Sequence, residues 1–337
     1  MTQYRESCAP VHYAIAGFGR FAIRRLLPAF RGCRMSQLYA VWKRTPFDHS
    51  ENPLRQEIKK ATYDARIYAT YADLLEDPKV EAVYITSANA DHVQQAQAAA
   101  SAGKHVLCEK PLAVTPQGCR KIITACRKNQ VLLMVAQTLR FSPAVQQIRA
   151  WMAEGKLGKI VRSEAQFFYD GTKSPRTWLY DYRVAGGGAL LDIGVHCIDT
   201  LRFLCGEIAA ADGFLTFDSI HKRIEIAAEL NLRFAANVLG HISCSYLSPY
   251  QSRLEIQGEL GRAWVEPFTL PWAEVEAHLE TADEISGVTV NTNNPYALLL
   301  DSFSRSIRGL EPVAVPGEEG LAAVSIINQI YKKFHKT

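Results

Sequence analysis

The feature that most constrains the fold is a regular alternation of strand-like and helix-like segments from residue 11 to residue 136. A short apolar run at residues 11–16 ends at a glycine and precedes an amphipathic segment at residues 20–30. Further strand-like runs lie at residues 37–42, 82–86, 106–108 and 131–136, with helix-like segments at residues 92–102 and 115–129. Strands that alternate with helices at this spacing favour right-handed crossovers and a parallel sheet covered on both faces. We therefore predict an α/β Rossmann domain with a doubly wound parallel sheet.

The pattern changes after about residue 138. Strand-like segments occupy 160–169, 223–234, 237–246, 253–257 and 261–266, and several of them alternate apolar with polar residues. Helical patterns cover 188–204, 295–308 and 318–334. Such alternation is typical of an antiparallel sheet with one wetter face. A chain of 337 residues is long enough for two domains. We predict a Rossmann domain over residues 1–138. An α+β domain with an open-faced, mostly antiparallel sheet follows over residues 139–337, with a last helix able to pack back on the first domain.

Bulk properties argue against several classes of partner. The formal net charge of +4 is small for this length and gives no support for an extended nucleic-acid surface. No apolar run approaches the roughly 20 residues that span a bilayer, and the first ten residues lack the apolar stretch of a secretory signal. The eight cysteines show no spacing typical of zinc or of a redox disulfide. We expect a cytoplasmic protein that binds no nucleic acid, membrane or metal.

A glycine-rich turn joins the first strand-like run to the first helix-like segment. Its first glycine permits a tight turn, its second lets the backbone approach a pyrophosphate, and the small Ala22 allows the helix to pack closely on the strand. The phosphates then lie at the positive N-terminus of the helix. A glycine pattern alone also fits a plain tight turn, but the order of strand, turn and helix favours dinucleotide binding. The predicted contacts are Gly17, Phe18, Gly19, Arg20 and Phe21.

The residues after the second strand-like run indicate which dinucleotide is bound. NAD sites of this kind carry an acidic residue there, which holds the ribose hydroxyls. This chain instead has Trp42, Lys43, Arg44 and Thr45. Two cations and a hydroxyl suit a 2′-phosphate, and a flat Trp or Arg side chain can stack on adenine. The alternative is a solvated basic loop, with Asp48 folding back to serve NAD. We predict NADP(H) as the preferred cofactor and NAD(H) as the alternative.

Two further segments carry side chains suited to acid–base chemistry. Lys110 follows a buried strand at the edge where open α/β sheets bind ligands, and its cation can stabilise a developing alkoxide. Asp192 and His196 stand four residues apart on a predicted helix, so the carboxylate can position the imidazole and keep its pKa near neutrality. Asp199 lies three residues further along the same face. The alternatives are a surface lysine and a structural histidine. The apolar neighbours of Asp192 and His196 favour function, because buried polar groups need partners or a ligand.

Together these motifs resemble those of the glucose–fructose oxidoreductase, inositol dehydrogenase and MocA (Gfo/Idh/MocA) family. The resemblance runs nearly end to end and includes the glycine turn, Thr86-Ser-Ala-Asn89-Ala-Asp-His92, Ala102-Gly103-Lys104-His105-Val-Leu-Cys-Glu109-Lys110-Pro111 and Gly186-Gly-Gly-Ala-Leu-Leu-Asp192-Ile-Gly-Val-His196-Cys-Ile-Asp199. It implies hydride transfer at a carbon that bears a hydroxyl or carbonyl, and a homodimer or homotetramer formed through the open-faced sheet. It also implies that His196 is the acid/base, that Lys110 contacts substrate oxygen and nicotinamide ribose, and that Asp192 binds substrate hydroxyls or tunes the other two.

The resemblance implies further site residues. The cofactor would be lined by Thr86, Asn89, His92, Glu109, Lys110 and Trp178, and the substrate by Tyr169, Tyr182, Arg183, Asp192 and His196, with Arg140 as a further pocket candidate. Leu179 stands where a basic residue is common, so Arg176 or Arg183 would supply that contact. The prediction is an NADP(H)-preferring dehydrogenase or reductase of a sugar, cyclitol or related polyol. Two alternatives are a non-catalytic NAD(P)-binding regulator and an enzyme for a non-sugar substrate such as an aromatic dihydrodiol, an imine or a tetrapyrrole.

Overall fold

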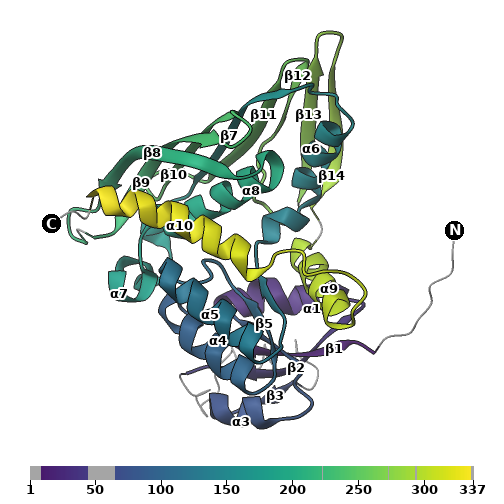
Figure 1. The fold of residues 1–337 in the computed structure, drawn as a ribbon, viewed down its shortest axis with the longest axis vertical. Coiled ribbons are helices and arrows are strands. Elements are labelled where there is room, and N and C mark those ends of the chain that lie inside the picture. The colour runs from purple at the N-terminus through teal and green to yellow at the C-terminus, as the bar shows by residue number, and fades with distance from the viewer. Residues whose placement is uncertain (1–8, 45–64, 222, 272, 293, 335–337) are drawn as a thin grey trace, which may run out of the picture. The chain divides into compact units, whose positions relative to one another are not determined.

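The computed structural model describes residues 9–44, 65–221, 223–271, 273–292 and 294–334 (Figure 1). The chain divides into two compact units. The first consists of Met1–Glu109, Arg120–Ala136 and Tyr296–Glu318, and the second of Lys110–Cys119, Gln137–Pro295 and Glu319–Thr337. The chain therefore passes between the units several times. The domain boundary expected at residue 138 stays a prediction.

The first unit is built on a six-stranded parallel sheet with the strand order β3-β2-β1-β4-β5-β6. Its strands are β1 (Val11–Ala16), β2 (Ser36–Trp42), β3 (Arg66–Ile67), β4 (Ala82–Ile85), β5 (His105–Cys108) and β6 (Leu133–Val135). The order reverses at β1, which has β2 on one side and β4 on the other. This reversal is the topological switch point of a doubly wound Rossmann fold, at which such sheets bind dinucleotides. The predicted parallel sheet is confirmed.

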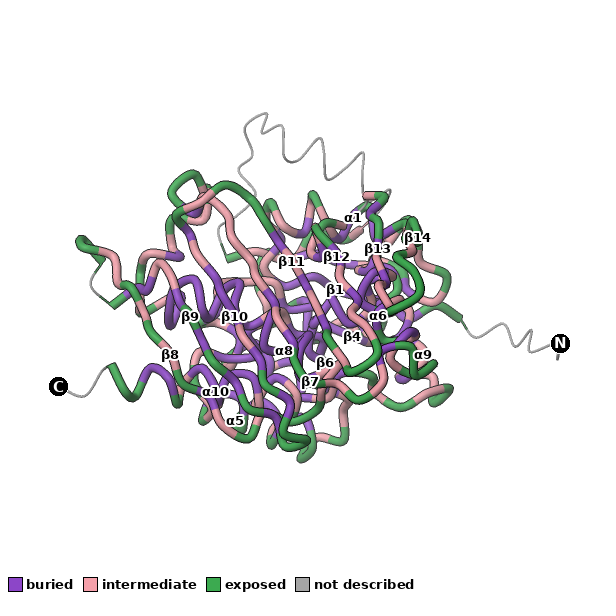
Figure 2. Tube along the Cα trace, turned by 90° about the horizontal axis from the view of Figure 1, so that it is seen from above, coloured by how far each residue is buried: buried purple, intermediate pink, exposed green. Residues whose placement is uncertain are grey.

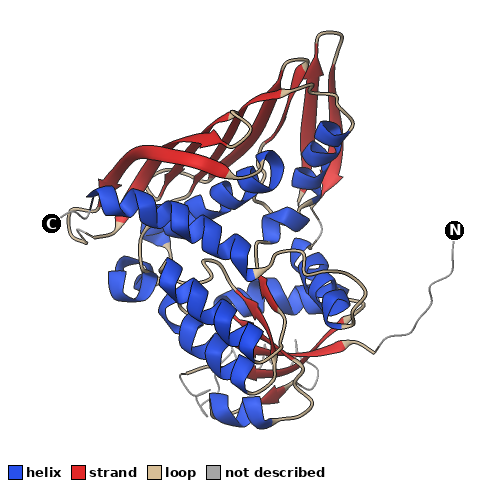
Figure 3. Cartoon of the chain, in the orientation of Figure 1, coloured by secondary structure: helices blue, strands red, loops and turns tan. Residues whose placement is uncertain are grey.

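Helices alternate with these strands along the chain (Figure 3). They are the π-helical segment η1 (Ala22–Leu26), α1 (Leu27–Gly32), α3 (Tyr71–Glu76), α4 (His92–Ser101), α5 (Pro116–Lys128) and, much later in the sequence, α9 (Pro295–Ile307). The Tyr13 hydroxyl of β1 donates to the Leu300 carbonyl of α9 at 3.2 Å, and its oxygen lies 3.0 Å from Ser304 Oγ. Its ring packs 5.6 Å from that of Phe30 in α1. Helix α9 therefore completes the core of the first unit.

The second unit contains an eight-stranded sheet with the order β14-β13-β12-β11-β7-β10-β9-β8. Its strands are β7 (Ile160–Phe168), β8 (Ile208–Phe217), β9 (Glu225–Phe234), β10 (Leu239–Ser245), β11 (Gln251–Gly258), β12 (Gly261–Val265), β13 (Glu274–Thr281) and β14 (Ile285–Asn291). Strands β7 and β10 pair in parallel, and all other neighbours pair antiparallel. The predicted mostly antiparallel sheet is confirmed.

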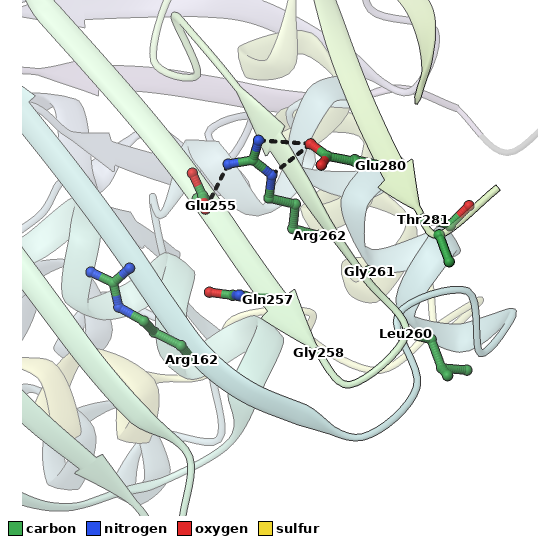
Figure 4. Close-up of a pocket in the computed structure, with 10 residues that line it drawn as sticks. Arg162, Glu255, Gln257, Gly258, Leu260, Gly261, Arg262, Glu280 and Thr281 are labelled. Carbon is green, nitrogen blue, oxygen red and sulfur yellow. Dashed lines mark hydrogen bonds and ion pairs between the residues drawn. The ribbon is translucent and has the colours of Figure 1, made fainter. Parts of the chain in front are cut away.

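Helices cover one face of this sheet and leave the other open (Figures 2 and 3). The covering helices are α6 (Pro143–Ala153), α8 (Val195–Cys205) and α10 (Gly317–Phe334). Along β9, Leu230 and Leu232 are buried while Glu229 and Asn231 are exposed, which is the alternation that a one-sided core requires. The open face carries a hollow beside Arg262, which pairs with Glu280 at 2.7 Å and lies 3.8 Å from Glu255 (Figure 4).

The helical segment Tyr182–Cys205 is central to this core. It is long and apolar enough to cross a membrane by length and composition, but 83% of its most apolar stretch is buried inside the protein. Burial of this extent accounts for it as a core helix. The segment contains α7 (Tyr182–Ala185), the glycine run, the π-helical segment η6 (Leu190–Gly194) and then α8. It therefore carries most of the polar residues predicted to act in the second unit.

Candidate active site

The glycine turn of the first unit packs tightly against the end of β4. Gly17 has a φ of 94°, and a Cβ at this position would lie 2.4 Å from the backbone nitrogen of Ser87. The N–H groups of Gly17 and Phe18 both donate to the Trp42 carbonyl at 2.9 Å. The Thr86 hydroxyl donates to the Gly17 carbonyl at 3.0 Å. Only glycine fits the first position of this turn.

The backbone at Gly19, the second glycine of the turn, has free space beside it. A Cβ at Gly19 would meet nothing closer than the Gly17 carbonyl oxygen, at 3.8 Å. Helix begins at Arg20, so the first backbone N–H groups of that helix lie at this end. A turn that leaves room beside its backbone and precedes a helix N-terminus is the cradle that a pyrophosphate requires. The residues present therefore fit a dinucleotide.

The other predicted cofactor residues follow the carboxyl ends of β2, β4 and β5, which meet at one edge of a parallel sheet. Trp42 packs on Tyr71 with ring centroids 5.0 Å apart. Arg44 forms an ion pair with Asp91, and 69% of its side chain is exposed. Glu109 accepts a hydrogen bond from the Tyr84 hydroxyl at 2.7 Å. Thr45 and Asp48, named as possible ribose or phosphate ligands, lie outside the described residues.

Two predicted cofactor residues, Asn89 and His92, are buried. Nε2 of His92 lies 3.2 Å from the Ser87 carbonyl oxygen, in the segment that touches the glycine turn. Phe21 packs on Tyr296 with ring centroids 5.7 Å apart. Asn89 and His92 are thus buried, whereas Phe21 and Trp42 are half-buried and Arg44 is exposed.

Replacing Gly17 with alanine is expected to weaken NADPH binding by at least about tenfold, because the new Cβ would collide with the backbone of Ser87. The positive φ adds strain of about 1–3 kcal/mol. Fluorescence titration with NADPH measures the effect. Gly103→Ala is the matched control: its φ is 73° but nothing lies within 4 Å of its Cβ, so it should lose some stability and keep affinity. Equal affinities for wild type and Gly17→Ala would contradict this account of the turn.

Lys110, Arg176 and Asp192 form a hydrogen-bonded charge cluster in the second unit. Lys110 Nζ donates to Asp192 Oδ1 at 3.0 Å and to the Asp192 carbonyl at 2.7 Å. Arg176 donates through Nη1 and Nη2 to the two carboxylate oxygens, at 3.2 and 2.9 Å. The hydroxyls of Tyr169 and Tyr246 each donate to Oδ2 at 3.1 Å. Asp192 thus accepts hydrogen bonds from two cations and two phenols.

The charge of Asp192 is maintained by this cluster. Burial alone would raise the pKa of its carboxyl group, but the positive charges of Arg176 and Lys110 and their hydrogen bonds lower that pKa well below its usual range. Burial likewise raises the pKa of Tyr169, and the neighbouring carboxylate of Asp192 raises it further, so the phenol stays protonated and able to donate. The cluster therefore contains two cations and one anion at neutral pH.

Strand register and helix geometry bring these groups together. Tyr169 and Tyr246 directly follow β7 and β10, which run in parallel, so the two tyrosines leave the sheet side by side with ring centroids 5.2 Å apart. Asp192 is the middle residue of the π-helical segment η6. Segments of this kind are rare and frequently occur at functional sites.

His196 lies beside this cluster in the first turn of α8. Its Nδ1 is buried and has no hydrogen-bond partner among the residues that the structure describes. Burial and the positive charge of Lys110 lower the pKa of His196 to about 3, so the imidazole is neutral at physiological pH. The expected near-neutral pKa is wrong for this arrangement, because burial and the charge of Lys110 outweigh the Asp192 carboxylate, which pairs with Lys110 and Arg176. The residue as a whole is only partly buried, so part of its side chain is open to a ligand.

Asp199 does not join this cluster. Its carboxylate accepts a bidentate pair from Arg140, with Nε 2.9 Å from Oδ2 and Nη2 2.7 Å from Oδ1. Arg140 also donates to Glu319 at 2.6 Å. Arg140 and Asp199 therefore form a buried ion pair within the core of the second unit, where each neutralises the other.

The other predicted residues of the second unit lie around the segment that precedes the glycine run. The Arg176 guanidinium lies 6.0 Å from the ring centroid of Trp178. The Tyr182 ring lies 4.1 Å below the Arg223 guanidinium, and Arg183 is exposed. Of this group, Arg176 supplies the direct contact with Asp192.

Sequence reasoning missed Tyr246 and offered Arg176 only as a substitute for Leu179. Tyr246 had one visible signal, its place at the end of a strand-like run. Its partner Tyr169 ends another such run 77 positions earlier, and only the parallel pairing of β7 with β10 makes the two adjacent. Such a pairing is not encoded locally.

Comparison with known proteins identifies the class. The model of the oxidoreductase family with an NAD-binding Rossmann fold matches residues 11–137, and the model of the GFO/IDH/MocA C-terminal domain matches residues 145–264. The chain is therefore a nicotinamide-dinucleotide-binding oxidoreductase. It belongs to the Gfo/Idh/MocA family, as its motifs predicted.

Similarity to individual members extends over most of the chain. A 1,5-anhydro-D-fructose reductase of Ensifer adhaerens is 30% identical over 254 residues, which cover 74% of this chain and 76% of the reductase. A D-xylose 1-dehydrogenase (NADP(+)) of Haloarcula marismortui is 24% identical over 335 residues, covering 96% of this chain and 91% of the dehydrogenase. The crystal structure of aldose–aldose oxidoreductase from Caulobacter crescentus complexed with glycerol has a TM-score of 0.86 at 26% identity, covering 96% and 97% of the two chains.

Proposed function

We propose that this oxidoreductase transfers hydride between NADP(H) and a hydroxyl- or carbonyl-bearing carbon of a sugar, cyclitol or related polyol. One observation carries the proposal: a lysine ammonium held by Asp192 lies beside a neutral, partly exposed imidazole. A fixed cation and a neutral base are the two groups that alcohol oxidation needs at the reacting oxygen. The sugar-related names of the relatives support the substrate class.

Each residue of the proposed site has a separate role in the reaction. The glycine turn and the residues that follow β2, β4 and β5 would hold the dinucleotide, whose nicotinamide would supply the hydride acceptor or donor. In the oxidative direction the imidazole of His196 takes the hydroxyl proton. The Lys110 ammonium stabilises the negative charge that develops on the substrate oxygen. Asp192 fixes the Lys110 ammonium in place through the 3.0 Å hydrogen bond, and Arg176 keeps Asp192 ionised.

The turnover test uses the purified full chain with NADP and NAD in both directions. The panel holds aldoses, ketoses, cyclitols, sugar acids and aromatic diols. We expect NADP(H)-dependent turnover of at least one polyhydroxylated compound. Tight NADPH binding without turnover of any panel member would contradict the proposed activity and favour a nucleotide-binding regulator.

We further propose that NADP(H) is preferred over NAD(H). Support comes from the cations Lys43 and Arg44 after β2, where an NAD site carries an acid, and from the NADP(+) in the name of the xylose dehydrogenase. Arg44 is largely exposed beside Asp91, so its guanidinium remains at the protein surface.

The double variant Lys43→Ala with Arg44→Ala is expected to weaken NADPH binding by about 10- to 100-fold and to change NADH binding by less than about threefold. Each charged hydrogen bond to a phosphate contributes about 1.5–3 kcal/mol, and 1.4 kcal/mol is a factor of ten. Dissociation constants of both cofactors, measured by fluorescence, give the ratio. Arg31→Ala with Lys79→Ala removes two exposed cations elsewhere in the first unit and should change neither. Equal losses for NADPH and NADH would rule out a phosphate site here.

We also propose a cytoplasmic homodimer or homotetramer whose subunits meet through the open face of the second-unit sheet. Phe214 of β8 and Leu239 of β10 lie on that face with 78% and 60% of their surface exposed, so an interface there would bury apolar surface. Sedimentation of the purified protein tests the assembly, and a monomer at micromolar concentration would exclude it.

The proposed catalytic set is Lys110, Asp192 and His196. The proposed domains are residues 1–138 and 139–337.

A further inference from the structure

The glycine run that precedes Asp192 and His196 is packed against two buried residues. A Cβ at Gly187 would lie 2.1 Å from the hydroxyl oxygen of Tyr331, and a Cβ at Gly188 would lie 1.9 Å from the carbonyl oxygen of Glu225. The run therefore lets the chain approach the start of β9 and helix α10 more closely than any other residue type would allow. Asp192 N donates to the Gly188 carbonyl at 2.9 Å, so the position of Asp192 depends on how this run is held.

Glu225 holds the run through its side chain. It is the first residue of β9 and is fully buried. Its Oε1 accepts hydrogen bonds from the backbone N–H groups of Gly188 at 2.8 Å and Leu190 at 3.0 Å. The first N–H groups of a helical segment have no partner within the segment, and the segment dipole favours a negative charge at this end. Glu225 thus anchors the beginning of the segment formed by η6 and α8.

Tyr331 holds Glu225 in turn. The Tyr331 hydroxyl of α10 donates to the same Oε1 at 2.6 Å. The other carboxylate oxygen, Oε2, is buried and has no hydrogen-bond partner in the described residues. Oε1 therefore accepts three hydrogen bonds, which come from two separate parts of the second unit. Such an arrangement fixes a helix start with respect to the sheet but leaves one half of the carboxyl group without compensation for its burial.

The environment of Glu225 makes its charge sensitive to pH near neutrality. Burial raises the pKa of Glu225 to about 7. The titratable groups that face it are Tyr331 from α10 and Cys244 and Tyr246 from β10 and its end. Burial raises the pKa of each of these three groups well above its ordinary value, so they remain neutral where Glu225 ionises. His196, with a pKa of about 3, does not titrate in this range either.

We propose that Glu225 is a positioning residue for hydride transfer: it fixes the turn that places Asp192 and His196, with Tyr331 as its support. The inference rests on the proposed function, since Asp192 and His196 are the groups it places. Ionised Glu225 is a stronger acceptor for the Gly188 and Leu190 N–H groups than protonated Glu225. Turnover is therefore expected to rise as pH increases through about 7.

The first test compares wild type with Glu225→Gln, which keeps the shape and one acceptor oxygen but cannot ionise. We expect kcat to fall about tenfold at pH 8, the value of one charged hydrogen bond, with the NADPH dissociation constant unchanged. The rise of kcat/KM through about pH 7 should be absent from the variant. A Glu225→Gln enzyme with wild-type kcat and the wild-type pH profile overturns the proposal.

Stability separates positioning from a merely structural role. A carboxyl group whose pKa is raised on folding contributes most stability below its unfolded pKa and loses that contribution as pH rises through about 7. Glu225→Gln should therefore have a Tm at pH 8 that equals or exceeds that of wild type, although its turnover is lower. A lower Tm that accounts for the lost activity would assign Glu225 to folding alone.

The second test needs no turnover, so it can fail separately from the proposed activity. Hydrogen–deuterium exchange of peptides that cover residues 186–196 should be about tenfold faster in Tyr331→Phe, which removes a donor from Oε1. Tyr13→Phe is the matched control, because it removes a buried phenol oxygen from the first unit. It should leave exchange at residues 186–196 unchanged. Wild-type exchange in both Tyr331→Phe and Glu225→Gln overturns the positioning role, whatever the turnover panel shows.

Discussion

His196→Asn is expected to lower kcat by about 100-fold or more and to leave the dissociation constant of NADPH within about twofold of wild type. Positioned proton transfer typically contributes about 10²–10⁴ in rate. Asparagine approximates the size of the ring but cannot accept the proton from the substrate hydroxyl. Because His196 Nδ1 has no partner among the described residues, the substitution breaks no hydrogen bond at that atom and should preserve the fold. Steady-state kinetics and a cofactor titration measure the two quantities.

The matched control for His196 is His241→Asn. His241 lies on the open face of the sheet, where it pairs with Glu229 at 2.9 Å. Turnover of this variant should equal that of wild type. If His196→Asn also turned over at the wild-type rate, His196 would not be the acid/base. If it lost NADPH affinity as well as turnover, the loss would reflect binding instead of proton transfer.

Asp192→Ala is expected to cost both turnover and stability. The substitution leaves Lys110, Arg176, Tyr169 and Tyr246 without their shared acceptor. Removing one partner of a buried ion pair typically costs about 3–5 kcal/mol, and the value should lie at the lower end because 41% of the Arg176 side chain is exposed. Turnover should fall by about 100-fold or more, since Lys110 loses its fixed position. Denaturant unfolding and steady-state kinetics measure the two effects.

The stability loss of Asp192→Ala has a defined pH dependence. The pKa of Asp192 is lowered on folding, so its contribution is fully present above the unfolded pKa of about 4 and is lost as pH falls below it. The difference between wild type and variant should therefore shrink in acid. Asp212→Ala removes an exposed carboxylate that pairs with Lys333 at 2.8 Å, and it should change stability by less than about 1 kcal/mol. A similar small change in Asp192→Ala would show that the cluster does not depend on this carboxylate.

Much of the fold was predictable because it is encoded locally. The run at residues 11–16 matches β1 residue for residue, and the glycine turn and the helix after it follow as expected. Strand β14 was missed because only its second half alternates, with Val288 and Val290 next to polar residues. Strand β13 alternates strictly, with Val275, Ala277 and Leu279 buried between polar residues, so its signal was present in the sequence and was overlooked. Strand β8 contains alanines and a glycine that lower its apparent strand propensity.

The residues of the site could be predicted from the sequence, but the pairs that they form could not. Lys110, Asp192 and His196 stood out as polar residues in apolar or sheet-edge contexts. The rule that residues four apart on a helix interact suggested an Asp192–His196 pair. The structure instead places Asp192 in a π-helical segment. The Asp192 carboxylate forms ion pairs with Lys110 and Arg176, which come from other parts of the sequence. Burial, together with the positive charge of the distant Lys110, lowers the pKa of His196, and no local pattern could reveal either cause.

The most direct test of the central claim is to follow the hydride itself. The protein is incubated with the carbonyl compound that the panel identifies and with NADPH that carries deuterium at C4, prepared separately with either face labelled. Hydride transfer predicts a reduced product heavier by about one mass unit from one labelled face only, and no labelled product from His196→Asn above about one hundredth of the wild-type rate. Product that carries no deuterium from either face would contradict direct transfer between nicotinamide and substrate.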